Sequence, residues 1–179
     1  MENKTRLVLG IVFCFVASCS VAAQSSSGAA PLNAWTTKPV EQHHESAEST
    51  YIRTVRAAKQ KGFDRVVFEF KGPLPNYSIE YLRSRWYEDD GGRHRLKLAG
   101  SAFVQIHLHL IPVDEEQLKL SEVKDFYPKG RLKFPSLTGV AEGTFFEGYY
   151  DFYLGVRARK LFRVTELSNP SRLVIDFKH

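Results

Sequence analysis

The stretch Asp64–Lys71, DRVVFEFK, has a close echo at the end of the chain in Ser171–Lys178, SRLVIDFK. Both alternate apolar with polar residues and are rich in β-branched and aromatic side chains, which is the pattern of a half-buried β-strand. In each, an arginine is followed four residues later by a carboxylate, Glu69 or Asp176, and then by Phe-Lys. The echo predicts two equivalent strands of one domain that share a core containing Phe68, Phe70, Ile175 and Phe177.

Six further strands are predicted along the chain. The clearest alternation is in Phe103–Ile111, FVQIHLHLI, whose aliphatic side chains all face one way. The stretch Pro112–Ser136 is irregular, with proline and glycine interruptions, and no strand is predicted there. About eight short strands, frequent Gly/Pro turns and no long helix predict an all-β fold, either an antiparallel β-sandwich or an open barrel. The other five strands are expected at residues 51–61, 77–82, 96–98, 144–156 and 162–167.

The N-terminus has the composition of a signal peptide, assigned to residues 1–23. An apolar run, Leu7–Ala17, follows the basic residues Lys4 and Arg6 and leads into small residues. The run is shorter than the roughly 20 residues that a permanent membrane span needs. Export to the periplasm or cell envelope is therefore predicted.

Two processing patterns overlap at the end of this segment. Val21-Ala22-Ala23 suits ordinary cleavage before Gln24, whereas Val16-Ala17-Ser18-Cys19 resembles a bacterial lipobox in which Cys19 would be acylated. We favour the lipobox, which makes a lipid on Cys19 the expected means of membrane attachment. In the alternative, Cys19 is removed with the signal peptide.

The remaining chain divides into a linker and one domain. Residues 24–50 are rich in Ser, Ala, Pro and polar side chains, which predicts a flexible linker, and the β domain is expected at residues 51–179. Both cysteines, Cys14 and Cys19, lie in the signal segment, so no disulfide can form within the domain. Its stability must therefore come from its core.

The charge balance is mildly basic and limits the class of partner. The chain carries 25 Lys and Arg against 20 Asp and Glu, a net charge of +5. These charges are spread along the sequence rather than clustered. They favour anionic polymers of the envelope, and export argues against nucleic acid as a partner.

Two stretches, Phe63–Leu82 and Phe162–His179, resemble the AMIN-like domain of bacterial secreted proteins and lipoproteins, a relative of the AMIN domain. The resemblance extends over residues 51–179. It implies a non-catalytic β-sandwich without cofactor or bound metal, which targets proteins to the envelope and has peptidoglycan or an envelope protein as its partner. The motif residues with a structural role are Arg65, Glu69, Arg172 and Asp176.

An aromatic run within residues 144–156 supplies the candidate binding surface. Strict alternation places Phe145, Tyr149 and Tyr153 on one face, and Phe146 with Tyr150, Phe152 and Leu154 in the core. Tyr149 and Tyr153 are candidates for stacking on sugar rings, with Arg157 and Arg159 attracting the carboxylates of peptide stems. The alternative is that these tyrosines cover an edge of the sandwich.

Two patterns suggest chemistry and lead to alternative functions. His107 and His109 alternate on one strand and could bring two imidazoles to a metal ion, which defines the alternative of a metal-dependent secreted enzyme. Glu69 and Asp176 could form the carboxylate pair of a glycoside hydrolase, but outward ion pairs explain them better. The chain has no Ser-centred nucleophile elbow or Gly-rich phosphate loop. We therefore expect no enzymatic activity, and a purely structural lipoprotein is the third hypothesis.

Overall fold

The computed structural model describes residues 30–46, 48–89, 91–111 and 126–179. The predicted signal peptide, Cys19 and most of the irregular stretch 112–136 lie outside these residues. Within the described ranges, no helix is long and apolar enough to cross a membrane.

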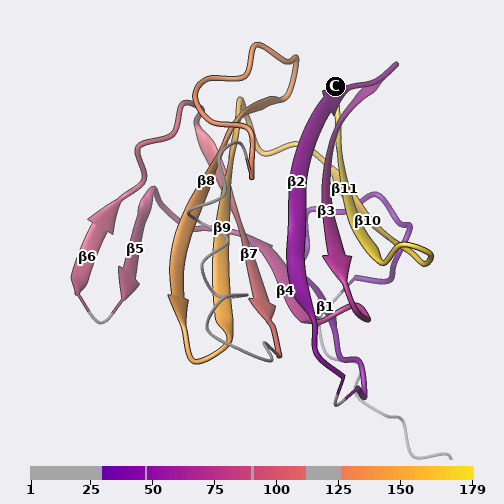
Figure 1. Ribbon diagram of the computed structural model, residues 1–179. Coiled ribbons are helices and arrows are strands. Elements are labelled where there is room, and N and C mark those ends of the chain that lie inside the picture. The colour runs from indigo at the N-terminus through magenta and orange to yellow at the C-terminus, as the bar shows by residue number, and fades with distance from the viewer. Residues whose placement is uncertain (1–29, 47, 90, 112–125) are drawn as a thin grey trace, which may run out of the picture.

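Two antiparallel sheets pack face to face as a β-sandwich (Figure 1). The strand order is β1-β4-β7-β9-β8 in the five-stranded sheet and β10-β11-β3-β2 in the four-stranded sheet, and β5-β6 form a separate hairpin. Neither sheet closes into a barrel, so the predicted sandwich is confirmed. The described chain contains eleven strands rather than about eight: β1 (Val40–Gln42), β2 (Tyr51–Lys59), β3 (Phe63–Lys71), β4 (Asn76–Tyr81), β5 (Trp86–Asp89), β6 (Gly92–Arg95), β7 (Ala102–His109), β8 (Leu137–Phe146), β9 (Tyr149–Val156), β10 (Phe162–Leu167) and β11 (Arg172–Lys178).

The two echoing stretches are β3 and β11, neighbours at the centre of the four-stranded sheet. Their antiparallel register places Arg65 opposite Asp176 and Arg172 opposite Glu69. Equivalent residues of the two strands are thus related by a local two-fold arrangement about the pair Val67 and Val174. The prediction of equivalent strands in one domain is confirmed.

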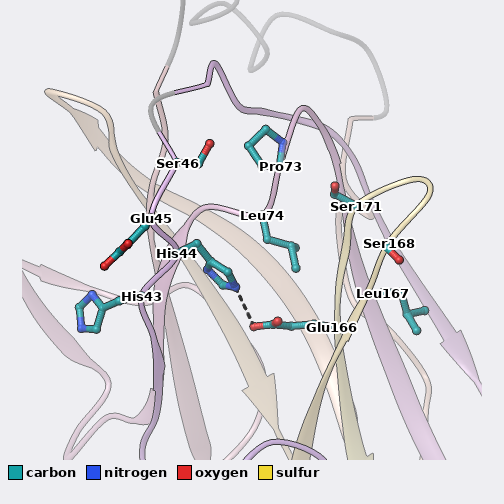
Figure 2. A pocket seen from close by; sticks show the side chains of 10 residues that line it. All are labelled: His43, His44, Glu45, Ser46, Pro73, Leu74, Glu166, Leu167, Ser168 and Ser171. Carbon is teal, nitrogen blue, oxygen red and sulfur yellow. Dashed lines mark ion pairs between the residues drawn. The ribbon is translucent and has the colours of Figure 1, made fainter.

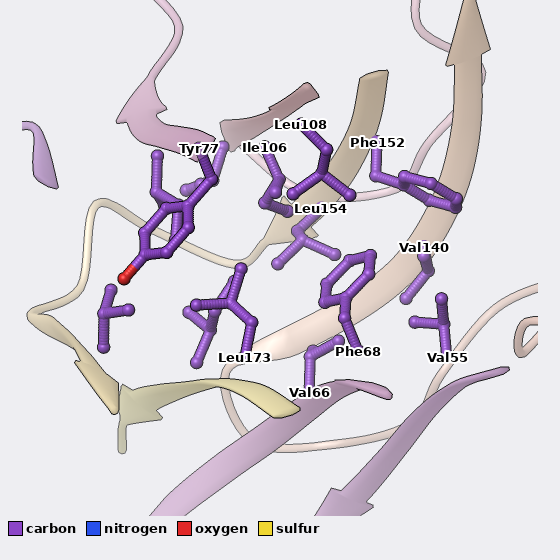
Figure 3. Close-up of a cluster of buried hydrophobic side chains, with 14 of the residues drawn as sticks. Val55, Val66, Phe68, Tyr77, Ile106, Leu108, Val140, Phe152, Leu154 and Leu173 are labelled. Carbon is purple, nitrogen blue, oxygen red and sulfur yellow. The ribbon is translucent and has the colours of Figure 1, made fainter. Parts of the chain in front are cut away.

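The core lies between the inner faces of the two sheets (Figure 3). Phe68 of β3 meets Phe152 of β9 edge to face, with 5.2 Å between ring centroids, and both side chains are fully buried. The alternation predicted for β7 is also confirmed, because its aliphatic side chains all enter this core. Apolar burial of this extent is the main source of stability for a domain without disulfides. The predicted core residues Phe68, Phe70, Ile175 and Phe177 all belong to the cluster.

The expected linker, residues 24–50, is not a free linker over its described part. Asn33 and Thr36 donate backbone hydrogen bonds to the carbonyls of Val164 and Phe162, each at 2.8 Å, along the outer edge of β10. The chain then continues as β1 and pairs with β4 of the other sheet. Its polar composition suits this position, since an edge segment keeps one side in solvent. The segment covers unpaired backbone groups on the same edge of both sheets.

The single strand expected at residues 144–156 is a hairpin instead. Glu147 and Gly148 form a two-residue turn with positive φ angles of 47° and 85°, and Phe146 pairs with Tyr149 across it. Two-residue hairpin turns usually contain Asn-Gly or Asp-Gly, and this one has Glu-Gly instead. The turn therefore carries no clear signal in the sequence, and the aromatic residues on both sides of it resemble one continuous strand.

The short strand expected at residues 96–98 is not present. The strands that precede this stretch are β5 and β6, which form the separate hairpin beside the five-stranded sheet (Figure 1). Tyr87 of this hairpin packs on Tyr153 of β9, with 4.8 Å between ring centroids. Leu96, which follows β6, joins Phe103 and Tyr153 in a second, smaller core. The hairpin thus covers part of the outer face of the sheet.

We expect Phe177→Ala and Phe70→Ala each to lower the free energy of unfolding by about 3–5 kcal/mol, because both rings are buried in the main core. Phe146→Ala is the control: this ring is 54% exposed, so its loss should change stability by about 0.5 kcal/mol or less. Urea unfolding followed by fluorescence measures all three. Equal effects at the three positions would contradict the assignment of the core.

A second prediction concerns the described chain from residue 30 to residue 46, which covers an edge of each sheet and which we call the edge segment. A protein that begins at residue 50 should have a lower unfolding temperature than one that begins at residue 30, because it loses β1 and the hydrogen bonds along β10. It should also self-associate more, since both sheets then expose an edge. Calorimetry and light scattering test this. Identical unfolding temperatures would show that the segment does not stabilise the fold.

Candidate functional site

The outer face of the five-stranded sheet carries a row of aromatic and polar side chains. The strand register aligns Ser78, His107 and Asp151 across β4, β7 and β9, and it places His109 opposite Tyr149. Residues opposite one another in antiparallel strands share a face. Because Phe146 pairs with Tyr149, it belongs to the same face. We call the group His107, His109, Phe146 and Tyr149 the platform.

Tyr149 holds the platform together. Its ring stacks on His109 and His107, with centroid distances of 4.5 and 5.1 Å and interplanar angles of 11° and 14°. Tyr149 is nevertheless 44% exposed. A rigid, partly exposed ring with a polar hydroxyl can stack on a ligand ring and hydrogen-bond to it at little cost in conformational entropy.

A hydrogen-bond network borders the platform. His107 Nδ1 lies 2.7 Å from Asp151 Oδ1, and the side-chain amide of Gln105 donates to the same oxygen at 3.1 Å. The hydrogen bond to Asp151 raises the pKa of His107 above its ordinary value, against partial burial, which lowers it. The network fixes the imidazole and leaves polar groups beside the exposed rings.

The contacts of the platform residues bear on the alternative of a metal site. No group of three or more His, Cys, Asp or Glu in the described residues is arranged to hold a metal ion. The imidazoles of both His107 and His109 are engaged by Tyr149. Ser78 stands opposite His107, but no hydrogen bond in the described chain joins its hydroxyl to the imidazole, as a nucleophile and its base would require.

The structure corrects two of the aromatic predictions. Phe146, expected in the core, is exposed on the platform, and Phe145 instead packs against the core beside Tyr150. The two-residue turn reverses the alternation assumed to run through this stretch. Tyr153 does lie on the same face as Tyr149, but the β5–β6 hairpin covers it and leaves it 1% exposed. It therefore cannot contact a ligand there.

The predicted arginines lie far from the platform. Arg157 and Arg159 follow the end of β9, whereas Tyr149 begins that strand, roughly 25 Å from Arg157 at about 3.3 Å per residue. The side chain of Arg157 donates to the carbonyl of Phe134 at 3.0 Å. Arg159 joins two arginines that the sequence analysis overlooked, Arg83 and Arg85, around an open hollow of about 510 Å³. The Arg-Ser-Arg run was the available signal for these two residues.

A second open hollow, of about 690 Å³, lies between the end of the edge segment and the turn that joins β10 to β11 (Figure 2). His44 and Glu166 point toward each other across it, with 3.2 Å between Nε2 and Oε1. Tyr77 donates its hydroxyl proton to Glu166 at 2.7 Å. Burial, reinforced by this hydrogen bond, raises the pKa of Tyr77. These contacts join β4, β10 and the edge segment. They therefore have a structural role.

The motif carboxylates are also occupied by arginines. Asp176 is fully buried and receives two hydrogen bonds from Arg65, at 2.7 and 3.0 Å, while Arg163 lies 2.8 Å from its other side. Glu69 pairs with Arg56 at 2.8 Å. The remaining motif residue, Arg172, donates to the carbonyl of Pro170 at 3.3 Å.

The His107–Asp151 pair should make stability depend on pH. A histidine whose pKa is raised in the folded state adds stability below about pH 6.5, which is lost as pH rises through the folded-state pKa. Asp151→Asn should lower the pKa of His107 in an NMR titration and reduce this loss. Glu147→Gln, the same charge change in the neighbouring exposed turn, is the control. An unchanged pKa of His107 in Asp151→Asn would refute the coupling.

Comparison with known proteins identifies the domain. The family model of the AMIN-like domain matches residues 50–179, which is most of the chain and almost the whole of the sandwich. A comparison with curated proteins gives no match. The match begins after the edge segment and includes the motif strands β3 and β11, as the resemblance predicted. The chain therefore belongs to the AMIN-like domain family.

Proposed function

We propose that this chain is a non-catalytic binding domain of the cell envelope, and that it holds the glycan of peptidoglycan on the platform. Membership of the AMIN-like family indicates a domain associated with the envelope in exported proteins. The proposal includes export by the N-terminal segment and a lipid on Cys19, which would keep the domain near the cell wall.

The exposed ring of Tyr149 is the observation that carries the proposal. It is stacked on the imidazoles of His107 and His109, and Phe146 beside it is 54% exposed. The apolar face of a sugar ring can stack on such side chains, while hydroxyls on its rim bond to His107 or Asp151. The platform is preorganised by the stacking of Tyr149 on both imidazoles, so binding orders few side chains.

The positions of the carboxylates support a binding rather than a hydrolytic role. Glycoside hydrolysis needs two carboxyl groups that reach the same bond from either side. Asp176 is fully buried between Arg65 and Arg163, so no glycan can reach it. Glu69 is held by Arg56 on the outer face of the four-stranded sheet. Asp151, which borders the platform, is engaged by His107.

Substitution at the platform should separate binding from stability. Tyr149→Ala and Phe146→Ala should each weaken sedimentation with purified sacculi by about tenfold, the loss of about 1.4 kcal/mol of contact energy. Their unfolding temperatures should stay close to that of the unmodified protein, because neither ring belongs to the apolar core. Co-sedimentation and thermal unfolding measure the two properties.

Tyr51→Ala provides the matched control, since this partly exposed tyrosine lies on β2 of the other sheet. It should bind sacculi normally. If the unmodified protein fails to sediment with sacculi, the glycan proposal is wrong and an envelope protein becomes the partner to seek. Equal weakening by Tyr51→Ala would show that the platform is not the binding surface.

A further inference from the structure

Positive charge is concentrated around the hollow of about 510 Å³, which lies at the end of the five-stranded sheet away from the platform. Arg83, Arg85 and Arg159 line this hollow, together with serines and backbone, and its described lining contains no aspartate or glutamate. None of the three arginines forms an ion pair with a carboxylate in the part of the chain that the structure describes. Like charges held together without a counter-charge repel one another, and a hollow lined by one sign of charge attracts ions of the opposite sign.

Two of these guanidinium groups are fixed in position. Arg85 lies over the ring of Phe103 at 5.0 Å and donates to the carbonyl of Gly100 at 3.2 Å. Arg159 lies over the ring of Tyr81 at 4.7 Å and donates to the carbonyl of Thr37 at 3.2 Å. Stacking holds each planar group without using its N–H donors, and a guanidinium has five of them. Most of these donors therefore stay available to a ligand.

The aromatic partners add no competing charge. Burial raises the pKa of Tyr81 to about 12, although the nearby Lys160 carbonyl and Arg159 act in the opposite direction. Its phenol is therefore neutral in the physiological range, and its hydroxyl donates to the Lys160 carbonyl at 2.7 Å. Tyr81 therefore supports Arg159 without neutralising its positive charge.

A second basic hollow has a volume of about 330 Å³ and is lined by Lys97, Lys129 and Arg131, again with no carboxylate in its described lining. The two hollows share no lining residue, but Ala99 lines one and its neighbour in the chain, Gly100, lines the other. Together the hollows are lined by six cationic side chains. The fold brings these side chains together from stretches that lie far apart in the sequence.

We propose that the two hollows together form one site for an anionic polymer whose repeated oxyanion groups, phosphates or carboxylates, are held by the arginines and lysines. Guanidinium groups match the geometry of both oxyanions and bind them through paired N–H donors. A polymer suits the site better than a single ion because the cations extend over two hollows rather than enclosing one point.

This site is distinct from the platform. Phe103, beneath Arg85, and His109, beside Tyr149, stand at opposite ends of β7, roughly 20 Å apart at about 3.3 Å per residue. The anionic polymer and the glycan can therefore be tested with different probes. Either proposal can fail without the other.

Direct binding tests the inference. The full domain, residues 30–179, is titrated calorimetrically with short-chain polyphosphate and, separately, with poly-L-glutamate at one physiological ionic strength. We expect saturable binding of at least one probe, and the probe that binds identifies the oxyanion. The double variant Arg83→Ala/Arg159→Ala should bind about tenfold or more weakly, since charge-assisted hydrogen bonds are lost. Arg83→Ala alone, which removes no hydrogen bond or ion pair within the described chain, serves as a variant that keeps the fold.

The matched control is Lys59→Ala/Lys61→Ala, which removes the same charge from exposed positions at the end of β2 in the four-stranded sheet. It should retain affinity to within about threefold, the residual effect of net charge at this ionic strength. Failure of both probes to bind would overturn the inference. So would an equal loss of affinity in the control, because binding would then depend on overall charge rather than on the hollows.

Discussion

The antiparallel pairing of β3 with β11 in a single register is the constraint on which the rest of the structure depends. It brings Arg65 beside Asp176, while every second residue of both strands enters the core. A slip of one residue would turn Asp176 inward and Phe177 outward, which would bury an unpaired charge and expose an aromatic ring. Arg163 completes the compensation of the buried carboxylate, and its guanidinium lies 4.8 Å from the Trp35 ring. The segment ahead of the family match thus also covers the motif on the outer face.

A second buried carboxylate joins the two sheets. Asp64 of β3 accepts hydrogen bonds from the backbone amides of Ser136 and Leu137, at 2.6 and 2.9 Å, where β8 of the opposite sheet begins. His179 lies 3.0 Å from its other oxygen and so attaches the end of the chain to the same point. Full burial of a carboxylate is tolerated because these donors replace its water. Asp64 thus adds a polar connection between the sheets, whereas the edge segment also contributes Ala30 and Val40 to the apolar core.

The two candidate surfaces occupy opposite ends of the five-stranded sheet because β7 and β9 cross its whole height. The turn at Glu147-Gly148 presents Tyr149 and Phe146 at one end, where no hairpin covers the sheet in the described chain. At the other end, the β5–β6 hairpin buries Tyr153, and the segments on either side of it border the basic hollows. The aromatic surface and the cationic one are thus chemically different and separate in space.

The sequence by itself determined the all-β class, the equivalence of β3 and β11, and the faces of β7 and β9, because alternation is a local property of an extended chain. It also placed Tyr149 at the surface. Only the tertiary structure decided that Tyr153 is covered, since the covering Tyr87 comes from a distant hairpin. The same holds for the basic hollows, whose cations come from four separate segments of the chain. Which strands pair, and what covers them, depends on contacts between residues far apart in sequence, and no local pattern encodes these.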